Sequence, residues 1–308
     1  PAKYVSVNGD VEKFRALNWT SDGFVSGIKG LSFDYDFSDG ALMSFDGHAI
    51  QGENDFGGDF LIEKEGLGQI QLDYDAFRKY YDGTGGQYNL FTTYSVNNLD
   101  NDLHMDMGSL HFALTPMLDN LHDMVFSYDR HAKIGSKSRL TWSAVKEGTA
   151  TKNIGPVYQD VDEVTETFSL EGKTNLAGID LSGKQIFETV DITSLRVERN
   201  LSTSTTPSDK KVRLHYQDPT AQSMTTLLNG GKWFNEEKSF VSMGYRFNKL
   251  NSYELENLVE TNEAGAPANF SSAKTRVNAT ADNEYLTHTM LANYLTKLTK
   301  NLNLTAKF

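Results

Sequence analysis

The sequence alternates apolar and polar residues with a period of two along most of its length. In residues 31–38 leucine, phenylalanine and tyrosine alternate with serine and aspartate, and residues 302–308 close the chain with the same pattern. A period of two places the two sets on opposite faces of a β-strand, whereas a helix would scatter them around its circumference. The pattern recurs often enough to predict an all-β fold of roughly 12–14 strands.

Short segments rich in glycine, asparagine, aspartate and proline separate the alternating runs. They lie at residues 38–40, 65–66, 82–86, 135–136, 175–178, 207–209 and 229–231. Such segments are typical of tight turns, so we expect hairpins between neighbouring strands. Residues 220–228, which follow Asp218-Pro219, are expected to form one or two helical turns instead.

Composition excludes several classes of protein. The net charge of −12 argues against a nucleic-acid binder, because neutralising phosphates needs a basic surface. The chain has no cysteine, which excludes disulfides, thiolate metal sites, cysteine catalysis and covalent haem attachment. No run of about 18 apolar residues exists, so we expect no transmembrane helix. Because the chain begins at Pro1 without methionine, we expect a processed or trimmed product.

Two all-β architectures fit this alternation. In a soluble sandwich or propeller the apolar faces meet in a shared core and the polar faces meet water. In an outer-membrane β-barrel the apolar face contacts lipid and the polar face lines a lumen.

Three features favour the barrel. The apolar face is rich in aromatic residues, which form girdles at membrane surfaces. Predicted strands such as 24–37 and 162–174 are longer than the ~5–6 residues usual in soluble proteins. The opposite face is densely polar, as a water-filled lumen requires. We therefore predict an antiparallel transmembrane β-barrel domain over residues 23–308, in the bacterial outer membrane, after a periplasmic or lumen segment over residues 1–22. A soluble secreted β-sheet protein is the alternative from another class.

Candidate surface residues follow from this prediction. Aromatic residues expected at the membrane interface are Tyr80, Tyr81, Trp142 and Tyr245. Polar residues expected to face the lumen are Asp34, Asp36, Asp73, Asp75, Arg213 and Arg246.

Catalytic and metal-binding motifs are absent from the sequence. It contains neither HExxH nor GxSxG, so we expect no enzyme and assign no catalytic or cofactor-binding residue. Asp129 and His131 share a strand face and fit a polar lumen row better than a catalytic pair. Asp100, Asp102 and Asp106 could hold calcium in a loop, but the loop lacks the glycine and closing glutamate of an EF-hand, which favours a solvated acidic loop.

Several segments resemble a known family. They are residues 9–15 (GDVEKFR), 22–28 (DGFVSGI), 68–75 (GQIQLDYD), 77–86 (FRKYYDGTGG), 158–163 (YQDVDE) and 298–304 (LTKNLNL). The chain resembles the MtrB-like outer-membrane β-barrels of porin–cytochrome electron conduits. Barrels of that family are usually larger than the strands counted here, so the resemblance implies that this chain is part of a larger barrel. The N-terminal CxxC of some relatives is missing.

The resemblance implies a structural role in extracellular electron transfer. The barrel would sit in outer-membrane lipid and sheath a multihaem c-type cytochrome held inside or beneath it. This chain would carry no cofactor of its own, since without cysteine any covalently attached haem must belong to the partner cytochrome. A general diffusion porin for small solutes is the alternative function for the same fold.

Overall fold

The computed structural model describes residues 2–82, 103–117, 124–147, 150–199, 211–235, 238–262, 274–299 and 302–308. Within these residues there are one helix and fourteen strands. In chain order they are β1 (Ala2–Val5), α1 (Val11–Asn18), β2 (Gly23–Asp36), β3 (Ala41–Gln51), β4 (Asp55–Lys64), β5 (Gly68–Tyr80), β6 (His104–Pro116), β7 (Met124–Glu147), β8 (Ala150–Leu176), β9 (Ile179–Arg199), β10 (Lys211–Gln217), β11 (Thr220–Phe234), β12 (Ser239–Asn262), β13 (Lys274–Thr299) and β14 (Leu302–Lys307).

All fourteen strands belong to a single antiparallel sheet in which strands that are neighbours in the sequence pair with each other. The exception is that β10 and β11 both pair with β9 and β12, so together they form one long strand with a break. The break falls at Asp218-Pro219, where proline has no N–H for the ladder. The helical prediction for residues 220–228 is therefore wrong, because this segment pairs on both sides.

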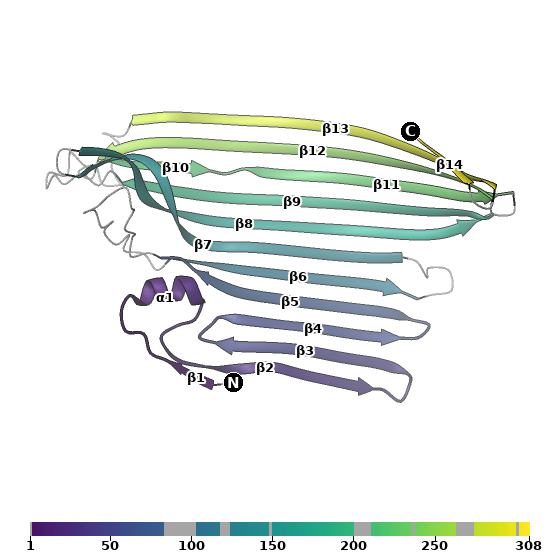
Figure 1. The fold of residues 1–308 in the computed structure, drawn as a ribbon, viewed down its shortest axis with the longest axis horizontal. Helices are drawn as coiled ribbons and strands as arrows, with labels where there is room; N and C mark the ends of the chain where they lie inside the picture. Colours follow the sequence, from purple (N-terminus) through teal and green to yellow (C-terminus); the bar gives the residue numbers. More distant parts are fainter. Residues whose placement is uncertain are drawn as a thin grey trace.

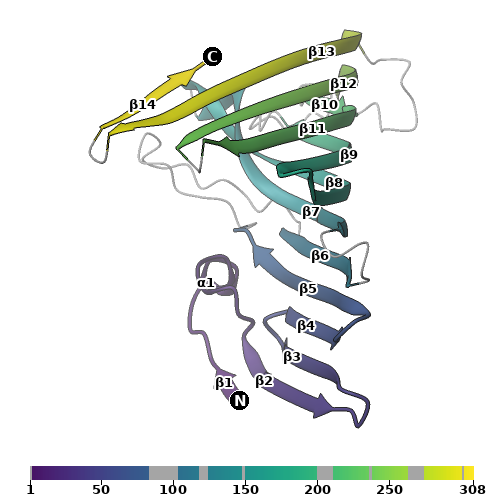
Figure 2. The same cartoon turned by 90° about the vertical axis from the view of Figure 1, so that its right-hand side faces the viewer.

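The sheet curves into an open arc. Its strands run side by side along the longest dimension of the molecule (Figure 1), and the turned view shows the arc from its end (Figure 2). Within the described residues, the first and last strands of the sheet do not pair with each other. The predicted all-β antiparallel fold and its strand number are confirmed.

Glycine-rich segments serve two purposes in this sheet. Those at residues 38–40 and 65–66 lie between strands, as predicted, and the segment 175–178 contains the turn between β8 and β9 at residues 177–178. The turn predictions at residues 135–136 and 229–231 are wrong, because these positions lie inside β7 and β11. A Cβ at Gly135 would come within 2.2 Å of the His104 carbonyl oxygen, so glycine permits close approach of β6 there. Residues 83–86 and 207–209 lie outside the described residues.

The helix α1 lies on the concave side of the arc, at one end of the strands (Figure 2). Its N-cap residue is Asp10, whose side chain accepts a hydrogen bond from the Lys13 backbone N–H at 3.1 Å. It ends at Trp19, which has a left-handed φ of 53° and stacks on Phe77 of β5 with ring centroids 6.1 Å apart. These contacts anchor α1 to the end of β5.

The sheet is a single layer with very little core. The accessible surface of the whole chain is 19459 Å², against about 13,000 Å² expected for a folded monomer of this mass. The buried hydrophobic residues among those described are Val25, Tyr80, Leu103, Met105, Val157, Val161 and Val197. They lie near the strand ends closest to α1, so most of both faces has no other part of the described chain against it.

Among the residues that the structure describes, no helix has the length and apolar character that a membrane-spanning helix needs.

Candidate functional site

The two faces of the sheet can be assigned from β5 and α1. Asp73, Asp75 and Phe77 are spaced by two on β5 and therefore share a face. Phe77 stacks on Trp19 next to α1, which lies inside the arc (Figure 2). This face is the concave face, and the face that carries Leu72 and Tyr74 is the convex face.

The convex face carries a continuous apolar band. The strand register places one row of side chains directly opposite one another from β2 to β11: Phe33, Phe45, Phe60, Leu72, Phe112, Tyr128, Phe168, Phe187 and Met224. The next row on the same face contains Tyr35, Met43, Ile62, Ile70, Leu114, Phe126 and Leu170. These side chains are open to the surroundings, with Phe33 48% and Phe168 44% exposed. Past Leu170 the second row continues with the polar residues Gln185 and Thr226. We call the two rows, together with Leu228, Tyr245 and Met290 of the adjacent convex row, the apolar band.

Ion pairs mark the margin of the apolar band on the side nearest α1. Arg78 of β5 donates two hydrogen bonds to Asp106 of β6, at 2.6 and 2.7 Å. Two further pairs lie on the convex face farther along the sheet, Arg130–Glu166 at 3.9 Å and Lys249–Glu284 at 3.6 Å. The band therefore stops at charged positions on β5 and β6, on β7 and β8, and on β12 and β13.

The height of the band can be measured along β5. Lys64, on the convex face at the opposite margin, pairs with Gly68, and Arg78 lies ten residues farther along the strand. Ten residues extend about 33 Å along a strand, or about 25 Å across a membrane for strands tilted by about 40°. This matches the apolar band of a transmembrane β-barrel, which is about 25 Å tall.

Both margins of the band move in the same direction across the sheet. The register places Lys249 of β12 in the same row as Leu72 of β5, and Arg78 lies three convex rows from Leu72. The α1-side margin has therefore moved by three rows between β5 and β12. At the other margin, Lys64 and Leu228 share a row, and Lys232 of β11 lies two convex rows farther from α1 than that row. This margin has therefore also moved away from α1. The strands are thus inclined to the band, as they are to the membrane normal in a barrel.

The concave face is polar. All six residues predicted to face a lumen lie on it: Asp34, Asp36, Asp73, Asp75, Arg213 and Arg246. One concave row contains Ser32, Asp46, Asp59, Asp73, His111, Asp129, Thr167, Glu188 and Ser223. Within it the Nδ1 atom of His111 lies 2.6 Å from a carboxylate oxygen of Asp129. Asp129 therefore lies in a polar row of the concave face, as predicted, and its hydrogen-bond partner is this cross-strand histidine.

A charged network crosses β9, β10 and β12 on the concave face. Arg213 donates to Glu260 at 3.0 Å, and the Nε2 atom of His215 lies 2.6 Å from Glu256. Arg196 contacts the other ring nitrogen of His215 at 2.9 Å. Opposite charges are interspersed here, so this part of the concave face has no single sign.

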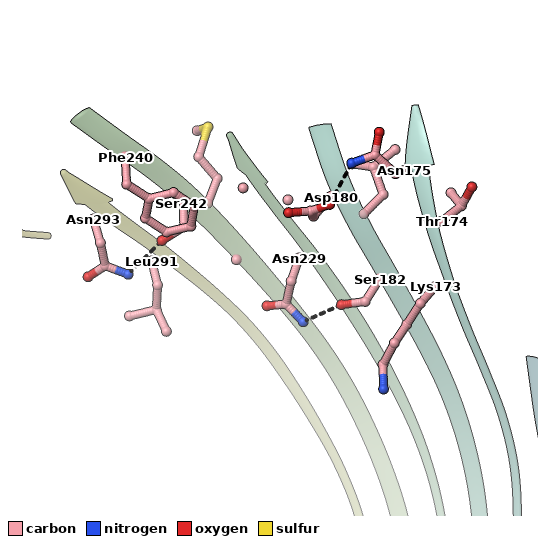
Figure 3. Close-up of a pocket in the computed structure, with 15 residues that line it drawn as sticks. Lys173, Thr174, Asn175, Asp180, Ser182, Asn229, Phe240, Ser242, Leu291 and Asn293 are labelled. Carbon is pink, nitrogen blue, oxygen red and sulfur yellow. Dashed lines mark hydrogen bonds between the residues drawn. The ribbon is translucent and has the colours of Figure 1, made fainter. Parts of the chain in front are cut away.

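A hollow of about 560 Å³ lies on the concave face, at the strand ends farthest from α1. Polar side chains line it together with apolar ones such as Phe240 and Leu291 (Figure 3). Three asparagine side chains donate hydrogen bonds along its wall, Asn175 to Asp180 (2.6 Å), Asn229 to Ser182 (3.4 Å) and Asn293 to Ser242 (3.3 Å). Gly230, Gly231 and Gly244 also line the hollow and leave it wide. Amides, hydroxyls and exposed backbone suit hydrogen bonding to another molecule.

The four predicted interface aromatics have different surroundings. Tyr245 lies on the convex face, and its hydroxyl is 2.8 Å from the Nδ1 atom of His288. Tyr80 does not fit the prediction: it is only 4% exposed, its hydroxyl accepts a hydrogen bond from Asn54, and the Arg15 guanidinium covers its ring at 4.3 Å. Tyr81 follows the end of β5, where the Lys79 ammonium lies 5.3 Å from its ring. Trp142 is in β7, and its side chain lies outside the described residues.

The calcium candidates do not form a common site in the described chain. Asp100 and Asp102 lie outside the described residues. Asp106 lies in a strand on the convex face, and both of its carboxylate oxygens accept hydrogen bonds from Arg78. Sequence reasoning missed His48 and Asp55, which the pairing of β3, β4 and β5 brings beside Asp75.

No family model, curated protein or solved structure matches the chain.

Proposed function

We propose that this chain forms the wall of an outer-membrane β-barrel that sheaths a multihaem c-type cytochrome in electron transfer across the membrane. The observation that carries the proposal is the two-faced, single-layer sheet. Its convex face is apolar between charged margins about 25 Å apart, and its concave face is polar and has little of the described chain against it.

Water is an unfavourable solvent for the convex face. Burying a leucine, isoleucine, phenylalanine or methionine side chain completely is worth about 1.5–3 kcal/mol, and the apolar band contains more than a dozen such side chains. Soluble monomers rarely expose contiguous apolar patches above a few hundred Å². Lipid tails supply the missing apolar contact, and the ion pairs at the margin then lie at the level of the lipid headgroups.

The concave face suits a large polar guest. Short side chains such as Ser127 and Ser169 occupy its middle, and the wide hollow with its three asparagines lies at one end. A partner protein can form hydrogen bonds with such a wall at many points. Because this chain has no cysteine, the proposal assigns all covalently bound haem to the guest.

The direct test is purification of the tagged chain from its native membranes in a mild detergent. We expect haem absorbance near the Soret maximum to co-elute with the chain at a fixed ratio. A haem-free chain that produces single-channel currents in a planar bilayer would replace the sheath with a diffusion porin. A folded chain recovered from the soluble fraction without detergent would contradict both membrane functions.

A further inference from the structure

Three side chains with metal-ligating atoms meet on the concave face of β3, β4 and β5. They are His48, Asp55 and Asp75, and one ligand atom from each lies within 4.8 Å of the others. The Nε2 atom of His48 is 3.0 Å from a carboxylate oxygen of Asp55. The strand register produces the cluster, since His48 pairs with Gly57 and Gly57 pairs with Asp75.

Gly57 gives the imidazole its position. A Cβ at this glycine would lie 2.4 Å from Cε1 of the His48 ring, so any other residue would displace the ring. With glycine there, the ring lies over β4 between the two carboxylates. A hollow of about 450 Å³, lined by His48, Gly57 and Asp75 among others, leaves room for an ion and its water ligands.

We propose that His48, Asp55 and Asp75 bind a divalent transition-metal ion such as Zn²⁺. One imidazole and two carboxylates form a donor set that suits Zn²⁺, Mn²⁺ or Fe²⁺, whereas Ca²⁺ and Mg²⁺ prefer oxygen ligands alone. Three protein ligands leave at least one position for water. The neighbouring concave row adds Asp46, Asp59 and Asp73, whose negative charges raise the local concentration of cations.

The experiment uses the full chain, purified in detergent micelles and freed of metal by a chelator. Zn²⁺ is then titrated calorimetrically, and bound zinc is counted after dialysis. We expect about one tight site per chain, and a loss of affinity of more than about 10-fold in His48→Ala and in Asp75→Asn. Gly57→Ala, which keeps all three ligands but displaces the ring, should weaken binding as well.

His111→Ala is the matched control. It removes another concave histidine, which is hydrogen-bonded to Asp129 and lies outside the cluster, and it should leave zinc binding unchanged. Circular dichroism of each variant verifies that the sheet is formed. The proposal is overturned if the wild-type chain binds no zinc, if folded His48→Ala, Asp75→Asn and Gly57→Ala all bind it as the wild type does, or if Ca²⁺ displaces Zn²⁺ at equal concentration.

Discussion

Arg78 and Asp106 face each other across β5 and β6 on the convex face, joined by two hydrogen bonds of 2.6 and 2.7 Å. On the α1-distal side of this pair the convex positions of β5 are Ala76, Tyr74, Leu72 and Ile70. The pair therefore stands where an apolar surface ends. Arg130–Glu166 and Lys249–Glu284 repeat the arrangement on later strands. Their positions define the orientation in which the sheet would meet a bilayer.

A charge should be costly on one face of β6 and tolerated on the other. Phe112 is near the middle of the apolar band, and its neighbour Ala113 is on the concave face. We expect Phe112→Arg to lower the free energy of unfolding in lipid vesicles by about 2–4 kcal/mol, because arginine is then held in hydrocarbon. Ala113→Arg should change it little. Urea titrations of both variants provide the measurement, and equal costs would contradict the assignment of the faces.

Bulk added to the concave face should weaken binding of the proposed cytochrome guest and leave the sheet folded. Ser169 contacts Ser127 on the concave face through hydroxyls 2.7 Å apart, and Phe168 lies next to it on the convex face. We expect Ser169→Trp to reduce co-purifying haem several-fold, because the indole occupies space next to the guest. Phe168→Trp should leave the haem yield at the wild-type level. A haem yield that responds only to Phe168→Trp would speak against a guest in the lumen.

The hairpin between β2 and β3 provides a pH-dependent interaction. A hydrogen bond from the Lys64 ammonium, together with one from the Ala41 N–H, holds the pKa of the Asp39 carboxyl below its usual value. A lowered folded-state pKa contributes stability above the unfolded-state pKa, and this contribution is lost as the pH falls through the folded value.

We therefore expect Asp39→Asn to be less stable than the wild type at pH 7, with the difference shrinking once the pH falls below about 4. Unfolding titrations at pH 7 and at lower pH measure this difference. In a Lys64→Met background the substitution should cost much less at pH 7. A difference that grows on acidification would have the wrong sign for this interaction.

The helix α1 should depend on its N-terminal cap. Asp10 accepts the Lys13 N–H at 3.1 Å, and loss of such a cap typically costs about 0.5–2 kcal/mol. We expect Asp10→Ala to speed hydrogen exchange of the α1 amides while the strand amides keep their rates. Asp10→Ser, which retains an acceptor, should exchange at nearly the wild-type rate. Unchanged α1 exchange in Asp10→Ala would show that the contacts of Trp19 and Arg15 alone hold the helix.

The sequence predicted the faces better than it predicted the turns. Alternation assigns Asp73 and Asp75 to one face and Leu72 and Tyr74 to the other, whatever strands pair with β5. Glycines are ambiguous, because the same residue permits a tight turn or a close approach between strands. Gly135 belongs to the second kind, and only the position of β6 reveals it.

The site residues that the sequence missed depend on register. His48, Asp55 and Asp75 come from three strands, and no local spacing links them. Tyr80 was predicted to be an interface aromatic, but Arg15 of α1 covers its ring. Alternation within β5 cannot predict that a helix packs there. The helix α1 was not predicted, although Asp10 before it is a favoured type of N-cap residue.

Spin labels test the central claim most directly, and the absence of cysteine makes single-cysteine labelling clean. Labels are placed one at a time along residues 109–114 of β6 in the chain reconstituted in lipid vesicles. We predict that oxygen, which concentrates in lipid, reaches labels at 110, 112 and 114, while a water-soluble nickel complex reaches those at 109, 111 and 113. Labels on both sets reached equally by the nickel complex would contradict the lipid-facing convex surface.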